Sequence, residues 1–225
     1  MKPKSPDELL NLTKSLFEAN EDLDLVLIGG LAAQEVYSMR RIRNSSDIDI
    51  AVRGEQNDKL IKRLRDNGYE TFYNETLDKY SAFKQEEGIH IDIYPDKVGK
   101  YTLDEDFWKR AKALDDIRVA SPEDLIGIKI YAYIASERGK IKHMIDIYSI
   151  IIGREEIDLE YLKNRLEKVA TILDLSIYKI LEYLKPEKKK NVLEQFRKKE
   201  IRFLEEESKK IIEYLSSEKY LFSKS

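Results

Sequence analysis

The chain has 225 residues, 42% of them hydrophobic, a length that allows one large domain or two small ones with buried cores. Its 40 Lys and Arg nearly balance 43 Asp and Glu, and a net charge of -3 excludes whole-molecule attraction to nucleic acid or membrane. Lack of cysteine excludes disulfides and thiolate zinc sites, and two histidines are too few for a histidine-built metal centre. Because no apolar run approaches a membrane span and no apolar signal region opens the chain, we expect a cytoplasmic protein with no membrane partner.

Hydrophobic periodicity predicts alternating helices and strands over the first half of the chain. A strand ending at Gly29 and Gly30 is followed directly by a helix, which indicates a tight glycine turn between them. The expected helices cover residues 6–19, 31–39 and 58–66 and a segment around Phe107 and Trp108; the expected strands cover residues 23–28, 46–52, 69–73, 80–84, 89–94 and 117–120. The short spacing between residues 69 and 94 favours antiparallel pairing there.

From Ser121 onward every pattern is helical. Ser121 is a good N-cap, and Pro122 suits the first helical position. Helices are expected over residues 124–136, 141–152, 159–170 and 176–184, with one long charged helix over residues 187–215. The sequence therefore predicts an α+β fold, with a mixed β-sheet and flanking helices in residues 1–120 and an all-α region in residues 121–225.

Two glycines and two aspartates stand in an order that suits triphosphate chemistry. Gly29 and Gly30 allow a close backbone approach, and the helix after them presents unpaired N–H groups and a positive dipole end to a phosphate. Asp47 and Asp49 are two residues apart on the next strand, so both carboxylates leave one face of the sheet about 7 Å apart. Nucleotidyl transfer needs both parts, a cradle for the triphosphate and carboxylates that hold magnesium at the reacting phosphate.

A third carboxylate is expected from a neighbouring strand. The segment from Ile89 to Tyr94 repeats the alternation of the Asp-x-Asp strand and places Asp92 on the face opposite its isoleucines. Carboxylates this close repel one another, and a divalent cation relieves the repulsion. Because magnesium prefers oxygen ligands, we predict a site for two Mg²⁺ ions held by Asp47, Asp49 and Asp92. Asp92 is also the expected general base.

This ordered set resembles the DNA polymerase β-like nucleotidyltransferase superfamily, whose motif is Gly-Gly or Gly-Ser, a helix, and a hydrophobic strand with Asp-x-Asp. The matching residues are Gly29, Gly30, Asp47 and Asp49. The chain departs from the Gly-Ser form at Gly30, which removes one hydroxyl that could contact phosphate. The resemblance covers about residues 23–152 and implies a nucleotidyltransferase catalytic domain over residues 1–120, with a helical C-terminal domain over residues 121–225.

The segment before the Asp-x-Asp pair further resembles the Arg-x-Ser/Thr-x-Asp-x-Asp form of the toxin-like nucleotidyltransferases of type IV abortive-infection systems. Arg43 and Ser45 carry that match, and with Ser46 they are candidate substrate-binding residues. That branch also has a lysine on one helix and an aspartate on a later helix, which Lys129 and Asp146 match. The resemblance implies that Lys129 contacts the nucleotide's phosphates with Asp146 near it, so both join the candidate catalytic residues.

Simpler structural roles are open for several of these residues. Lys129 and Asp146 lie in largely apolar helices, so an ion pair that fixes the two helices together is nearly as well supported as phosphate binding. Arg43 could belong to a solvated basic loop, and His90 is more simply a satisfied strand histidine. The lysines at 188–190 are more simply a solvated helix face, because charges of both signs follow them.

Together these features predict magnesium-dependent transfer of a nucleotidyl group from a nucleoside triphosphate to an acceptor. The sequence leaves the acceptor open among RNA such as tRNA, a protein and a small molecule. Membership of the toxin-like branch would imply an antitoxin partner. The alternative is a non-catalytic nucleotide-binding or regulatory module with a decayed site.

Overall fold

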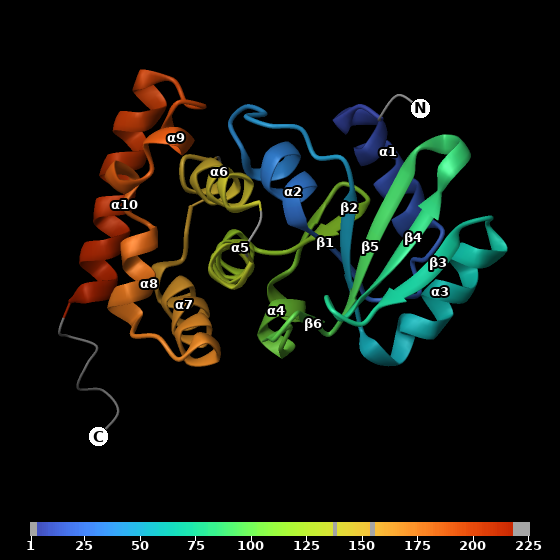
Figure 1. Cartoon of the computed structure of the whole chain (residues 1–225). Helices are drawn as coiled ribbons and strands as arrows, with labels where there is room; N and C mark the ends of the chain where they lie inside the picture. The colour runs from blue at the N-terminus through green and yellow to red at the C-terminus, as the bar shows by residue number, and fades with distance from the viewer. Residues whose placement is uncertain (1–3, 137–138, 154–155, 218–225) are drawn as a thin grey trace. The chain divides into compact units, whose positions relative to one another are not determined.

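Helices and strands alternate in the first half of the chain, and helices alone follow (Figure 1). The computed structural model describes residues 4–136, 139–153 and 156–217. These residues divide into two units, the first formed by residues up to 36 and by residues 43–121, the second by residues 37–42 and the described residues from 122 onward. The α+β fold with a mixed sheet and an all-α C-terminal region is confirmed.

Seven strands form the mixed sheet of the first unit, in the order β3-β4-β5-β2-β1-β9-β8. The strands are β1 (Leu25–Ile28), β2 (Ile48–Val52), β3 (Glu70–Asn74), β4 (Lys79–Lys84), β5 (Ile89–Pro95), β8 (Lys112–Leu114) and β9 (Ile117–Val119). Strand β2 runs parallel to β5 and β1 parallel to β9, while the other neighbours are antiparallel, including the predicted β3-β4-β5 run. A separate two-stranded ribbon joins β6 (Lys97–Val98) to β7 (Tyr101–Thr102).

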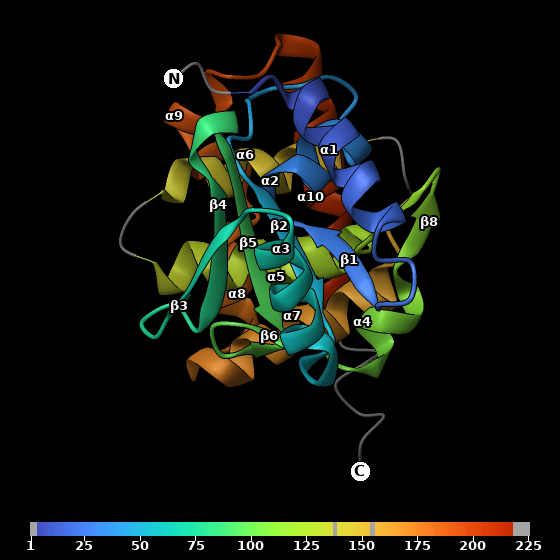
Figure 2. The ribbon, with the colours of Figure 1, turned by 90° about the vertical axis from the view of Figure 1, so that its right-hand side faces the viewer.

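Helices α1 and α3 cover one face of this sheet, in front of the strands in Figure 2. They bury Leu9 and Leu60, and Ile48 and Ile50 of β2 are fully buried. Because side chains alternate along a strand, Asp49 between these isoleucines points to the opposite face. The helical segments up to residue 110 are α1 (Pro6–Glu18), α2 (Gly29–Leu31), η1 (Ala32–Tyr37), η2 (Gly54–Gln56), α3 (Asn57–Asp66), η3 (Gln85–Glu87) and α4 (Glu105–Arg110).

The helix predicted over residues 31–39 begins earlier, at Gly29, and its later part, from Ala32 to Tyr37, is π-helical. Gly29 has φ +76°, a backbone conformation that side-chain-bearing residues rarely adopt. The glycine turn is therefore the first turn of the helix itself. Short π-helical segments are rare and occur frequently at functional sites.

The second unit is helical throughout its described residues after Ser121, apart from connections. Its segments are α5 (Pro122–Ala135), α6 (Lys140–Ile151), α7 (Leu159–Leu173), α8 (Ile177–Tyr183), η4 (Pro186–Lys188), α9 (Lys190–Leu193) and α10 (Lys198–Ser216). None of the helices in the described part of the chain combines the length and the apolar character that crossing a membrane requires.

The prediction of a single helix over residues 187–215 is wrong, because the chain leaves helical geometry before α10. Phe196 is buried, and Arg197 is extended at φ -76°, ψ 153°. The carboxylate of Glu200 accepts a hydrogen bond of 2.8 Å from the Arg197 N–H and also forms an ion pair of 2.8 Å with Arg40. This cap starts a new helix at α10. The three-residue strand β8 was also missed by the periodicity.

A buried ion pair joins α5 to α6. The Lys129 ammonium lies 2.8 Å from the Asp146 carboxylate, and the side chains are 7% and 0% exposed. The predicted pairing of the two helices by these residues is therefore present. Charges so deeply buried are tolerated because each neutralises the other.

We predict that Lys129→Met lowers the free energy of unfolding by about 3–5 kcal/mol, because the buried Asp146 carboxylate loses its paired cation. Urea unfolding followed by circular dichroism measures the loss. The double variant Lys129→Met with Asp146→Leu should recover much of it. As a control, Lys209→Ala breaks an exposed pair with Glu213 on α10 and should leave the stability nearly unchanged. Equal stabilities of Lys129→Met and the unmodified protein would contradict the structural role.

Candidate active site

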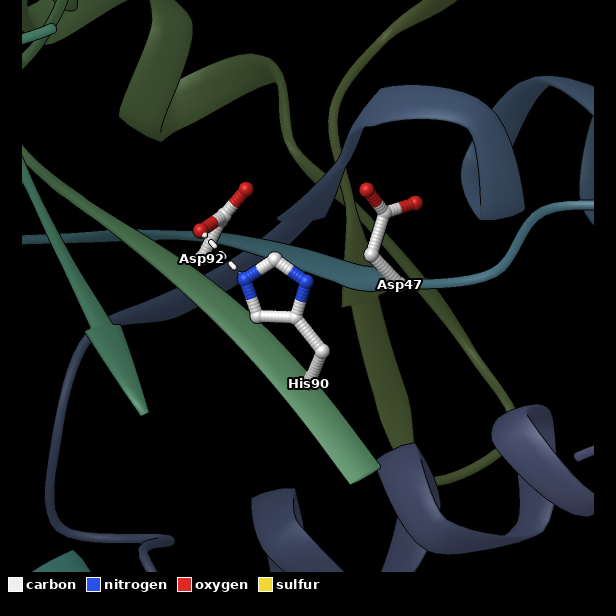
Figure 3. A group of neighbouring side chains, drawn as sticks. All are labelled: Asp47, His90 and Asp92. Atoms are coloured by element: carbon white, nitrogen blue, oxygen red, sulfur yellow. Dashed lines mark hydrogen bonds and ion pairs between the residues drawn. The ribbon is translucent and has the colours of Figure 1, made fainter. Parts of the chain in front are cut away.

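The face of the sheet opposite α1 and α3 carries a row of polar side chains, here called the site face. In the strand register, Asp49 of β2 lies beside Asp92 of β5, and Asp92 lies beside Ser81 of β4. Asp47 immediately precedes β2, and His90 lies two residues before Asp92, so period-two alternation places both on the same face. Figure 3 shows Asp47, His90 and Asp92 gathered there.

Asp92 is the most deeply buried carboxylate on the site face, at 4% exposure. The Ser81 hydroxyl donates a hydrogen bond of 2.7 Å to its Oδ1, and His90 Nε2 lies 3.0 Å from the same oxygen. The Lys79 ammonium forms an ion pair with the other oxygen. Burial alone would raise the pKa of Asp92, but the hydrogen bonds from His90, Lys79 and Ser81 outweigh it and lower the pKa to about 2. Asp92 therefore stays ionised across the physiological range.

The His90 ring, which contacts Asp92, also stacks on an aromatic side chain. Its ring lies 4.2 Å from the Phe83 ring at 15°, and Phe83 lies 5.2 Å from Phe72 at 7°. Burial acts to lower the pKa of His90, yet the hydrogen bond and charge of Asp92, with the charge of Asp47, raise it above the usual 6.5. His90 therefore has both a hydrogen-bond partner and a stacking partner, as expected of a structural strand histidine, and it also contacts the carboxylate cluster.

Gly29 makes room for Asp49. A Cβ atom built on Gly29 would overlap the Asp49 carboxylate, so a side chain at position 29 cannot coexist with this carboxylate position. The Tyr94 hydroxyl donates to the other Asp49 oxygen at 3.4 Å. The pKa of Tyr94 is raised well above its usual value, first by burial and then by the charges of Asp49 and Asp92. Tyr94 therefore stays protonated as a donor.

Gly30 makes room for the chain before β2. A Cβ on Gly30 would overlap the Arg43 guanidinium and would lie 2.9 Å from the Ser45 hydroxyl. Ser45 is buried, and its hydroxyl donates to the Asp47 carboxylate at 3.2 Å. The missing side chains at the two glycines thus let the helix start approach both the arginine loop and the Asp-x-Asp strand.

The family comparison agrees with this constellation. Residues 6–184 match a protein family described as "Uncharacterised nucleotidyltransferase". The chain belongs to this family. It is accordingly a nucleotidyltransferase. No protein with a curated description matches the chain.

Solved structures resemble this nucleotidyltransferase at low identity. A candidate nucleotidyltransferase from H. pylori is 18% identical and aligns over 93% of this chain and 94% of its own, with a TM-score of 0.50. The lincosamide antibiotic adenylyltransferase LnuA, bound to lincomycin, is 20% identical over 66% of this chain and 99% of its own, with a TM-score of 0.46. ANT(2")-Ia in complex with adenylyl-2"-tobramycin is 16% identical over 73% and 92%, with a TM-score of 0.46. At such identities the likeness to the H. pylori protein bears on the fold alone.

Most of the predicted site residues of the nucleotidyltransferase lie together in the first unit. They are Gly29, Gly30, Arg43, Ser45, Asp47, Asp49 and Asp92. Ser46 lies between two of them in sequence and is exposed. Lys129 and Asp146 belong to the second unit, where they bind each other.

The donors on the site face fit a divalent cation. Asp47, His90 and Asp92 each offer one ligand atom, and these atoms all lie within 4.8 Å of one another. Asp49 is not in this trio, although it neighbours Asp92 in the strand register. Carboxylate oxygens are the ligands that magnesium prefers, and the imidazole adds a nitrogen donor. This chemistry suits the predicted metal site, with Lys79 as the internal cation that shares Asp92.

Three residues of the site face were missed from the sequence. Lys79 and Ser81 come from β4, and Tyr94 comes from β5 two residues after Asp92. A signal was present, because Lys79-x-Ser81 on one strand and Asp92-x-Tyr94 on its antiparallel neighbour alternate in the same way. Recognising it required the register of β4 against β5, which the sequence does not state.

We predict that Gly29→Ala destabilises the protein and abolishes nucleotidyl transfer, because the new methyl group displaces Asp49. Gly68→Ala is the matched control, since Gly68 also has positive φ, at +83°, but its nearest heavy atom would lie 3.8 Å away. Each alanine carries a backbone strain of about 1–3 kcal/mol, and only Gly29→Ala adds about 1–3 kcal/mol of overpacking. Urea unfolding and a transfer assay on both variants test this. Equal losses of stability, with activity kept in both, would contradict the close approach.

Proposed function

We propose that this nucleotidyltransferase moves a nucleotidyl group from a nucleoside triphosphate to an acceptor hydroxyl in a magnesium-dependent reaction. One observation carries the proposal: Gly29 leaves space that the Asp49 carboxylate fills, beside Asp92 in the strand register. The helix start and the carboxylates are thereby held at one place on the site face. A triphosphate and its cation need these two parts together.

The triphosphate would bind at the start of the helix. Gly29 and Gly30 present backbone N–H groups without side chains that would block an approaching phosphate, and the helix dipole favours its negative charge. The Arg43 guanidinium, which lies against Gly30, supplies a positive charge next to these groups. Ser45 supports this arrangement by fixing Asp47.

Asp47, Asp49 and Asp92 would hold the magnesium. When bound, magnesium neutralises charge on the phosphates and stabilises the charge that develops during transfer. Ser81 and His90 orient Asp92, while the stack of Phe83 fixes the His90 ring. The lowered pKa of Asp92 suits it to holding a cation more than to accepting a proton. We therefore assign it the ligand role and leave the acceptor's proton to solvent water.

Nucleotidyl transfer would be a nucleophilic substitution at the α-phosphorus. The acceptor hydroxyl oxygen forms a bond to this phosphorus, and the bond from the α-phosphorus to the bridging oxygen breaks. Pyrophosphate leaves with that electron pair, and the hydroxyl proton passes to water. The chain contributes by holding the phosphates at the helix start and by orienting the carboxylates on the site face.

The narrower assignment to the type IV abortive-infection toxin-like branch rests on Arg43, Ser45, Lys129 and Asp146. Arg43 and Ser45 lie against Gly30, which supports their part in substrate binding. The Lys129–Asp146 ion pair supports a structural role and leaves a phosphate contact as a prediction. An RNA or protein acceptor and an antitoxin partner belong to this narrower proposal.

We predict that the protein transfers label from an α-³²P nucleoside triphosphate to one fraction of a cell extract only when magnesium is present. All four bases should be tested, with the RNA, protein and small-molecule fractions separated. Asp49→Asn should slow transfer by about 100-fold or more, because a charged group at the reacting phosphate is lost. Asp66→Asn, at an exposed position on α3, is the matched control and should keep full activity. Transfer that survives Asp49→Asn would count against the proposed site.

A further inference from the structure

A hollow lies wholly within the helical unit. It has a volume of about 370 Å³ and is lined by parts of α5, α6, η4 and α9. We call it the lysine pocket, because four lysines line it. The lining includes Tyr133, Lys140, Met144, Lys188, Lys189 and Lys190. Its volume falls in the range that small ligands occupy in proteins. The three consecutive lysines, which the sequence assigned to a solvated helix face, therefore border a cavity.

The charge of the lysine pocket is strongly positive. Four lysines line it against one carboxylate, Glu187. Lys188 already pairs with Glu182 outside the pocket. Among the described residues, Lys140, Lys189 and Lys190 have no carboxylate within ion-pair distance. Uncompensated ammonium groups around a concave surface attract anions.

Tyrosine rings hold two of these ammonium groups. Lys189 Nζ lies 5.6 Å from the centre of the Tyr133 ring and 5.5 Å from that of Tyr183, and Lys140 Nζ lies 5.8 Å from Tyr133. Burial lowers the pKa of Lys189, which agrees with a partly desolvated cation. Cation–π contacts at such sites are weaker than a hydrogen bond to a charged group. A phosphate would therefore be a stronger partner for these lysines, and the rings would be left to contact an aromatic base.

A buried hydroxyl on α6 also lacks a hydrogen-bond partner among the described residues. Tyr148 is fully buried, and its hydroxyl makes no hydrogen bond to any described residue. Its pKa is raised, first by burial and then by Glu187 and Tyr133, both of which line the lysine pocket. Tyr148 follows Met144, which lines the pocket, by four residues on α6, so the two side chains lie on the same side of that helix. An unsatisfied buried hydroxyl is destabilising, and a ligand with polar atoms would satisfy it.

We propose that the lysine pocket binds a nucleotide through its phosphate and its base, with Lys140, Lys189 and Lys190 around the phosphate and Tyr133 against the base. The nucleotide is either free or part of a single-stranded nucleic acid, since both present the same phosphate and ring. This site is formed by the second unit alone and does not depend on the carboxylates of the site face.

The test is fluorescence anisotropy with a labelled short oligouridylate, in EDTA and on an Asp49→Asn background. These conditions remove the metal-dependent part of the proposed catalytic site, and the lysine variants below act on the pocket alone, so the two proposals can fail separately. Lys189→Gln with Lys190→Gln should weaken binding about tenfold or more. The matched control, Lys209→Gln with Lys210→Gln on the exposed side of α10, removes the same charge and should change binding less than twofold. Circular dichroism checks that both variants fold.

Competition then identifies the source of the ligand. If uridine monophosphate displaces the oligonucleotide and inorganic phosphate does so more weakly, the pocket takes a free nucleotide. If only longer strands compete, it takes a nucleotide within a strand. Tyr148→Phe should weaken binding while leaving urea stability equal or higher, because only the unsatisfied hydroxyl is removed. No measurable binding, or equal weakening by the two double-lysine variants, would overturn the proposal.

Discussion

Negative charges placed side by side on a partly buried sheet face are the constraint on which this structure depends. The parallel pairing of β2 with β5 puts Asp49 beside Asp92, and Asp47 offers a ligand atom within 4.8 Å of one from Asp92. Buried carboxylates repel one another unless a cation or several hydrogen-bond donors neutralise them. Lys79, Ser81 and His90 meet this need around Asp92, and Tyr94 donates to Asp49. The same need explains why Gly29 has no side chain, since the carboxylate fills that space.

The second unit uses its charges differently. Asp146 and Lys129 neutralise each other at the join between α5 and α6, and Glu200 pairs with Arg40 where α10 begins. In both pairs each charge is neutralised by its partner, and the pairs fix the helices in place. Of the lysines that line the pocket beside α9, Lys188 pairs with Glu182, whereas Lys140 and Lys189 lie over tyrosine rings. This difference is why we propose a binding role for the lysine pocket and a structural role for the buried ion pairs.

Hydrophobic periodicity predicts most of the helices and strands, but it does not predict which strands pair or where a helix is interrupted. The Gly29–Gly30 helix start and the alternation through Asp49 and Asp92 are local patterns, so the strands and the candidate carboxylates could be predicted. Lys79 joins them only through the β4–β5 register, which depends on contacts between strands. The interruption before α10 depends on Glu200 capping Arg197 while binding Arg40, a residue far away in the sequence. The lysines at 188–190 were assigned to a helix face because the continuous run of charges gives no sign that the helix is interrupted before α10.

Electron paramagnetic resonance of Mn²⁺, titrated with a non-hydrolysable nucleoside triphosphate present, tests whether a divalent cation completes the crowded carboxylates of the site face. We expect bound Mn²⁺ in the unmodified protein and at least about tenfold weaker binding in Asp47→Asn, because a ligand is lost. In Lys79→Met, binding should be equal or tighter, because the internal cation no longer competes for Asp92. Equal Mn²⁺ affinity in the unmodified protein and in Asp47→Asn would show that these carboxylates do not hold the cation.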